Sequence, residues 1–140
     1  MFAKFTQITA AAVAAVLAMS MTTEAAPATS QALARRNVGD ATFFNPGLGA
    51  CGIFNTDADM ITAVSSSFFD TFPGATPNPN LNPLCGKPIS VSANGRTIVV
   101  TIVDKCPGCV GQDLDLSPTA FSQLADLSVG RLHGVTWNFI

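Results

Sequence analysis

The sequence contains no tyrosine, one tryptophan and one histidine, and only 11% of its 140 residues are charged. Cations are especially few after Arg36, where four lysines and arginines stand against eight aspartates and give a net charge of −4. The four are Lys87, Arg96, Lys105 and Arg131. Such a surface would repel a phosphate backbone or an anionic lipid headgroup. We therefore expect neither nucleic acid nor a membrane as partner, whereas a neutral polysaccharide remains suitable.

Long apolar runs are equally scarce. The one run, residues 8–19, follows Lys4 and precedes small residues, and it is shorter than the roughly 20 residues that a membrane span requires. This pattern is typical of a secretory signal peptide, which we assign to residues 1–26. Residues 27–36 are polar, and their closing pair Arg35-Arg36 indicates either a propeptide cleavage site or an ordinary solvated charge pair.

We favour cleavage, which leaves residues 37–140 as one domain of 104 residues with a single core. The chain is expected to be secreted, extracellular, released rather than anchored, and monomeric.

All four cysteines lie in this domain: Cys51, Cys85, Cys106 and Cys109. An exported chain meets an oxidising compartment, so two disulfides are expected. Three pairings are possible, and we expect Cys51–Cys85 with Cys106–Cys109. A redox dithiol at Cys106-Pro107-Gly108-Cys109 would normally begin a helix within a βαβ pattern, which is lacking, and zinc would need the other two cysteines as ligands. We therefore interpret this motif as a small structural disulfide, with no metal.

Short segments rich in β-branched residues, separated by turns, dominate the domain. Strands are expected at residues 41–44, 60–65, 89–92, 97–103 and 134–140. Asn94-Gly95 is a hairpin turn, and Ser117-Pro118 begins a helix that we extend to Gly130. Ser66–Phe69 adds a short turn, whereas the prolines of Phe72–Pro83 predict a surface loop without regular structure. Without a βαβ rhythm, this mainly β pattern indicates a small barrel.

Several motifs, in order and spacing, resemble the RlpA-like double-psi β-barrel family, which expansins, barwin, loosenins and family 45 endoglucanases share. The motifs are Gly39-Asp40-Ala41-Thr42-Phe43-Phe44, Ala50-Cys51-Gly52, Cys85-Gly86, Val103-Asp104-Lys105-Cys106, Leu114-Asp115-Leu116-Ser117-Pro118 and Val135-Thr136-Trp137. The resemblance is closest to small secreted fungal proteins of the expansin-like or loosenin-like kind. It implies a six-stranded double-psi β-barrel with one or two short helices, stabilised by disulfides.

The resemblance also implies an open groove that binds an extended glycan. Asp115 of the Leu-Asp-Leu-Ser motif would contact the sugar chain, flanked by Thr42 and Asp104. Relatives carry a tyrosine or tryptophan at the groove. Because this chain has no tyrosine, Phe43 or Phe44 would have to supply the stacking face.

Glycoside hydrolysis requires two carboxyl groups about 5 to 9.5 Å apart. Asp104 and Asp115 are a candidate pair, but the second aspartate of hydrolytic relatives has no counterpart in residues 42–49, and Asp40 shares the face of Thr42 only if the strand begins early. Each acid also has a structural interpretation. The charge of Asp115 would be stabilised by the N-terminal dipole of the following helix. Asp104 would accept hydrogen bonds from loop N–H groups and so fix the loop, and for Asp104 we favour this structural interpretation.

Our first functional hypothesis is a non-enzymatic, expansin-like protein that binds cell-wall polysaccharide and loosens it without hydrolysis or a cofactor. The enzymatic alternative is a family 45-like endoglucanase or lytic transglycosylase with Asp115 as its acid. A third hypothesis is a protease-inhibitor or effector-type module that binds proteins through Phe72–Pro83. His133 is interpreted as a solvated strand residue and Trp137 as part of the core.

Overall fold

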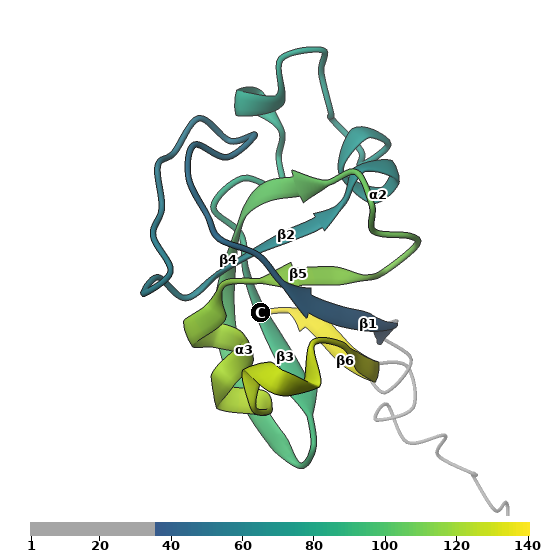
Figure 1. Ribbon diagram of the computed structural model, residues 1–140. Coiled ribbons are helices and arrows are strands. Elements are labelled where there is room, and N and C mark those ends of the chain that lie inside the picture. Colours follow the sequence, from purple (N-terminus) through teal and green to yellow (C-terminus); the bar gives the residue numbers. More distant parts are fainter. Residues whose placement is uncertain (1–35) are drawn as a thin grey trace, which may run out of the picture.

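The computed structural model describes residues 36–140, so the expected signal peptide and propeptide lie outside the described residues. Six strands form one closed barrel in the order β1-β5-β2-β4-β3-β6 (Figure 1). The strands are β1 (Asn37–Phe43), β2 (Ile61–Ser65), β3 (Pro88–Ala93), β4 (Arg96–Cys106), β5 (Leu114–Leu116) and β6 (Leu132–Phe139). The expected six-stranded, mainly β fold is therefore confirmed.

Two of the barrel's neighbouring pairs are parallel, β1 with β5 and β2 with β4, and the other four are antiparallel. A tight turn at Asn94-Gly95 joins β3 to β4, as expected, and both turn residues have positive φ. The parallel pairs bring together segments that are distant in the sequence. They decide which side chains meet at the candidate site.

Two α-helices and two 3₁₀ turns accompany the barrel, and α3 lies against its lower part (Figure 1). They are α2 (Ser66–Asp70), η1 (Pro79–Leu81), α3 (Pro118–Leu124) and η2 (Leu127–Val129). None of the helices in residues 36–140 has the length and apolarity needed to span a bilayer.

Helix α3 begins where the sequence predicts but ends earlier. The Ser117 hydroxyl accepts the Ala120 N–H, and Pro118 occupies the first helical position. The helix stops at Leu124 because Ala125 has extended backbone, and a separate 3₁₀ turn precedes Gly130. The expectation of a continuous helix to Gly130 is wrong.

The loop of residues 72–83 also departs from expectation, because it contains the short turn η1. Asn78 caps this turn through its side chain, and Pro79 fits the first position. Buried Asn82 anchors the loop: its amide group donates to the Phe69 carbonyl, and its side-chain oxygen accepts the Leu84 N–H. This loop is therefore fixed against the core despite its prolines.

The barrel interior is filled by large apolar side chains that are almost fully inaccessible. Trp137, Phe69 and Phe121 are the largest of them, and Trp137 also donates its indole N–H to the Gln112 carbonyl. The expected core position of Trp137 is thus confirmed. Because Leu114, Leu116 and Val64 belong to the same core, the alternate residues of β5 and β2 point away from it.

Candidate functional site

Four residues form one row across four adjacent strands, on the face that points away from the core. Thr42 of β1 pairs with Asp115 of β5, Asp115 with Ala63 of β2, and Ala63 with Asp104 of β4. Paired positions in a sheet point to the same side. The fold thus places Thr42, Asp115 and Asp104 on a common face, as the resemblance implied, and we call them with Ala63 the outer row.

Asp115 is the centre of this row. The Thr42 hydroxyl donates to its Oδ1 at 2.7 Å, and the side chain is half-buried. Burial raises the pKa of Asp115, and the Asp104 charge adds to the rise, while the Thr42 hydrogen bond and the Arg131 charge act against it. The carboxylate therefore stands at the boundary between protein and solvent, within reach of a ligand.

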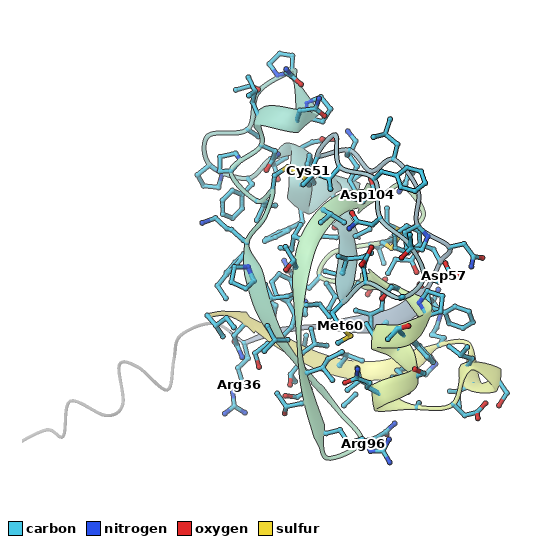
Figure 2. All side chains as sticks on the ribbon, turned by 90° about the vertical axis from the view of Figure 1, so that its left-hand side faces the viewer. Arg36, Cys51, Asp57, Met60, Arg96 and Asp104 are labelled. Atoms are coloured by element: carbon cyan, nitrogen blue, oxygen red, sulfur yellow. A yellow bond between two sulfur atoms is a disulfide. The ribbon has the colours of Figure 1, made fainter. Side chains whose placement is uncertain are left out.

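Asp104 lies under the loop that carries Cys51 (Figure 2). Its Oδ1 accepts the N–H of Ala50 at 2.7 Å and that of Lys105 at 2.8 Å. The loop approaches so closely that a Cβ at Gly49 would come within 2.6 Å of the Val103 carbonyl and 3.2 Å of Asp104 itself. These contacts match the loop-fixing interpretation.

The two candidate stacking residues diverge. Phe43 packs against Phe121 with ring centroids 5.0 Å apart and belongs to the edge of the core. Phe44 follows the last residue of β1 and is half-buried, and strand alternation puts it on the side of Thr42. Of the two, Phe44 is the one beside the outer row.

Both expected disulfides form: Cys51–Cys85 and Cys106–Cys109. The shorter one borders the outer row, because its sulfurs and an Asp115 carboxylate oxygen lie within 4.8 Å of one another. Among the described residues, these three could act together as metal ligands. Sulfurs joined in a disulfide are not thiolates, however, and thiolate is the form that ligates metal.

Asp40 is not part of the outer row that contains Asp115. The strand does begin early enough, at Asn37, to include Asp40. Its Oδ2 instead contacts Arg131 at 3.2 Å and His133 Nδ1 at 2.9 Å, and these partners lower its pKa against the effect of desolvation. His133 is an exposed strand residue, as expected.

Sequence reasoning missed an apolar ridge on the loop between β1 and β2. Leu48, Ile53 and Phe54 are 74%, 46% and 73% exposed, and a β-bridge joins Leu48 to Phe54. The sequence does place these three apolar residues among glycine, asparagine and cysteine, a composition that predicts a loop and therefore exposure of its apolar side chains. We call these three residues the loop ridge.

The ridge is held rigidly by the surrounding structure. Cys51 lies between Leu48 and Ile53 in the sequence. It forms a disulfide with Cys85 and donates its N–H to the Val103 carbonyl at 3.1 Å. A Cβ at Gly52 would meet the Asn80 side chain at 2.9 Å, so this loop packs on the loop of residues 72–83. The two loops thus form one surface, and Cys85, to which the first loop is bonded, lies just after the second.

Comparison with known proteins identifies a family and several relatives. A family model described as lytic transglycolase matches residues 36–136. The papain inhibitor of Streptomyces mobaraensis is 38% identical over 127 residues, covering 88% of this chain and 85% of the inhibitor. A solved Streptomyces papain inhibitor is 39% identical with a TM-score of 0.68, covering 76% of this chain and 94% of that one.

A mutant expansin of Clavibacter michiganensis, solved in complex with cellohexaose, is also similar. It is 25% identical with a TM-score of 0.61, and the match covers 75% of this chain. The match spans only half of the expansin chain.

Proposed function

Because the chain belongs to the RlpA-like double-psi β-barrel family, we propose that it binds a neutral cell-wall polysaccharide at the outer row and loosens it without hydrolysis. The site consists of Asp115, Thr42 and Phe44. The same proposal includes secretion by the signal peptide of residues 1–26 and removal of residues 27–36, which suits a chain with two disulfides.

One observation carries the proposal: the half-buried carboxylate of Asp115, held by the Thr42 hydroxyl at 2.7 Å, lies on an outward face. Such a pair offers an acceptor and a hydroxyl to sugar hydroxyl groups and needs no charge on the ligand. The expansin relative, whose complex contains cellohexaose, supports a glycan as ligand.

The surroundings of Asp115 favour binding over hydrolysis. Asp104 is the other acid in the row, but two backbone N–H groups already use its carboxylate. Asp40 is occupied by Arg131 and His133. A hydrolase would need a second carboxyl free to act as base or nucleophile.

A second candidate function is inhibition of a papain-like protease. It is supported by the papain inhibitor relative, which aligns with most of both chains, and by the loop ridge. Leu48 and Phe54 are large, exposed and fixed by a disulfide and by Asp104. A pre-organised apolar projection loses little conformational entropy on entering a protein cleft. In this function the ridge, rather than Asp115, would make the contact.

One experiment separates these functions. The chain is incubated with cellulose, chitin or peptidoglycan, and retention and released reducing ends are measured in the same tubes. We expect retention without release, and a loss of about tenfold or more in affinity for Asp115→Asn, since hydrogen bonds to charged groups contribute most. Asp57→Asn, which removes an exposed charge near Asn45, serves as the matched control.

The same proteins are then titrated against papain, together with a Leu48→Ser/Phe54→Ser variant. Reducing ends or cleaved glycan released by the unmodified chain and abolished in Asp115→Asn would establish the enzymatic alternative. Papain inhibition that the ridge variant loses, with no retention on any polymer, would overturn the glycan proposal in favour of the second candidate.

A further inference from the structure

A small cavity lies on the side of the barrel opposite the outer row. It has a volume of about 180 Å³ and is lined by Phe72, Lys87, Pro88, Phe139 and Ile140. Strands β3 and β6, which supply Pro88 and Phe139, are neighbours in the closed order and stand across the barrel from β5 and β2. We call this cavity the β3–β6 pocket, and the glycan proposal makes no use of it.

The walls of the pocket are aromatic and firmly supported. The Phe72 and Phe139 rings have centroids 6.1 Å apart, and Phe139 also meets Trp137 edge-on at 5.6 Å. Phe68 belongs to the same aromatic cluster, and its ring centroid lies 5.6 Å from that of Trp137. Phe139 nevertheless remains 41% exposed. The cavity thus presents apolar surface whose shape is fixed by the core beneath it.

Lys87 gives the pocket its one cationic group. In the described part of the chain, ion pairs of lysine and arginine join Lys105 to Asp70 and Arg131 to Asp40, and Lys87 takes part in none. A lysine stem covers apolar wall while its ammonium stays in water at the rim. The pocket therefore combines two aromatic side chains with a lysine that takes part in no ion pair of the described residues.

We propose that the β3–β6 pocket binds a small ligand that joins an aromatic or branched apolar body to a carboxylate. The apolar body would displace water from the Phe72 and Phe139 rings, and the carboxylate would reach the Lys87 ammonium. A cavity of this size admits a body of about one ring. The net negative charge of the rest of the domain disfavours anions elsewhere, so the attraction is local to Lys87.

Two sources can present this chemistry: a free aromatic acid, or the C-terminal residue of a peptide. The test uses the ¹⁵N-labelled chain and three probes, 3-phenylpropionate, its neutral amide, and an acetylated tripeptide that ends in phenylalanine. Binding is followed through backbone amide shifts. We expect shifts at Lys87 and Phe139, and an affinity for the acid at least tenfold above that for the amide. Whichever of the free acid and the tripeptide binds more tightly identifies the source.

Two variants make the result specific. Lys87→Gln should abolish the preference for the acid over the amide, while Arg96→Gln should preserve it. Arg96 is an exposed cation at the tip of the β3–β4 hairpin (Figure 2), so it controls for the general loss of one positive charge. Equal affinity for acid and amide, shifts remote from the pocket, or an unchanged preference in Lys87→Gln would each overturn the proposal. Such a failure would leave the glycan proposal untouched, because the two sites share no residue.

Discussion

At the scale of single residues, the fold disfavours the charged form of Asp115. Its folded pKa is raised above the usual 3.8 because burial disfavours the charged form, and the Asp104 charge adds to this. Well below pH 3.8 the group is neutral in both states. As the pH rises toward the folded pKa, the unfolded chain loses its proton first, so the folded state binds more protons and stability falls across that window.

Asp115→Asn should remove this loss of stability. We expect the variant to be as stable as the unmodified chain at about pH 3, and more stable once the pH exceeds the folded pKa of Asp115. The gain is on the order of 1 kcal/mol or less, because the side chain is only half-buried and water screens its charge. Urea unfolding at a series of pH values measures the difference.

Asp126→Asn provides a control in which the pH dependence of stability has the opposite sign. Hydrogen bonds from Ser128 lower the pKa of Asp126, so its contribution to stability is present above 3.8 and disappears as the pH falls. This variant should be less stable than the unmodified chain at neutral pH and converge with it in acid. If both variants respond to pH in the same direction, the environment assigned to Asp115 is wrong.

We propose that Asp104 supports the loop rather than a ligand, and Asp104→Ala tests this. The substitution leaves the N–H groups of Ala50 and Lys105 without their acceptor, which should cost about 1–3 kcal/mol in the free energy of unfolding. Hydrogen exchange of the Ala50 amide should accelerate at the same time. Asp57→Ala, which loses only exposed contacts with Asn45, should stay within about 0.5 kcal/mol. Unchanged exchange at Ala50 would contradict this role.

At the scale of elements, Ser117 determines where α3 begins. Its hydroxyl accepts the Ala120 N–H and donates to the Asp59 carbonyl, so one buried side chain caps the helix and fixes the incoming loop. Ser117→Ala should cost about 1–2 kcal/mol, at the upper end for an N-cap, because the Asp59 carbonyl also loses its donor. Thermal or urea unfolding measures the cost.

Ser122→Ala is the matched control within the same helix. Ser122 is exposed and bonds only the Thr119 carbonyl one turn earlier, and alanine is the better helix former. The control should therefore be neutral or slightly stabilising. Equal losses in the two variants would show that the cost of Ser117→Ala does not come from the loss of its cap.

Elements that depend on local chemistry could be predicted from the sequence, and those that depend on distant pairing could not. The Asn94-Gly95 turn and the Ser117-Pro118 helix start are encoded in adjacent residues. The three residues of β5 have no strand signal of their own and are extended because β1 and β2 pair with them on either side. The end of α3 was missed because the apolar spacing beyond it continues while the backbone does not.

The candidate site illustrates the same limit. Thr42 and Asp115 are 73 residues apart and meet only through the parallel pairing of β1 with β5. Their expected proximity came from the family resemblance, since neither spacing nor composition reports a parallel register. Strand alternation predicts that Phe43 and Phe44 point to opposite faces, but which face is the core follows from where β1 lies in the barrel. The β3–β6 pocket likewise requires a closed barrel before it exists.

At the scale of the whole molecule, the two disulfides should contribute unequally to stability. In the chain-entropy model, the stabilisation grows with the length of the closed loop. Cys51–Cys85 spans 34 residues and Cys106–Cys109 spans three. Replacing the longer pair by alanine should therefore cost about 4 kcal/mol and the shorter pair about 2. Urea unfolding of the two double variants measures both, and a larger loss from the shorter pair would contradict the model.

The same two variants should also separate the two candidate activities. The longer disulfide joins the loop of the ridge to Cys85, just after the loop of residues 72–83, so its loss should weaken papain inhibition and spare polysaccharide retention. The shorter one borders Asp115, so its loss should weaken retention and spare inhibition. Measurements are made under conditions where each variant is folded, as judged by its amide spectrum. Parallel losses of both activities in both variants would mean that the ridge and the outer row do not act as separate sites.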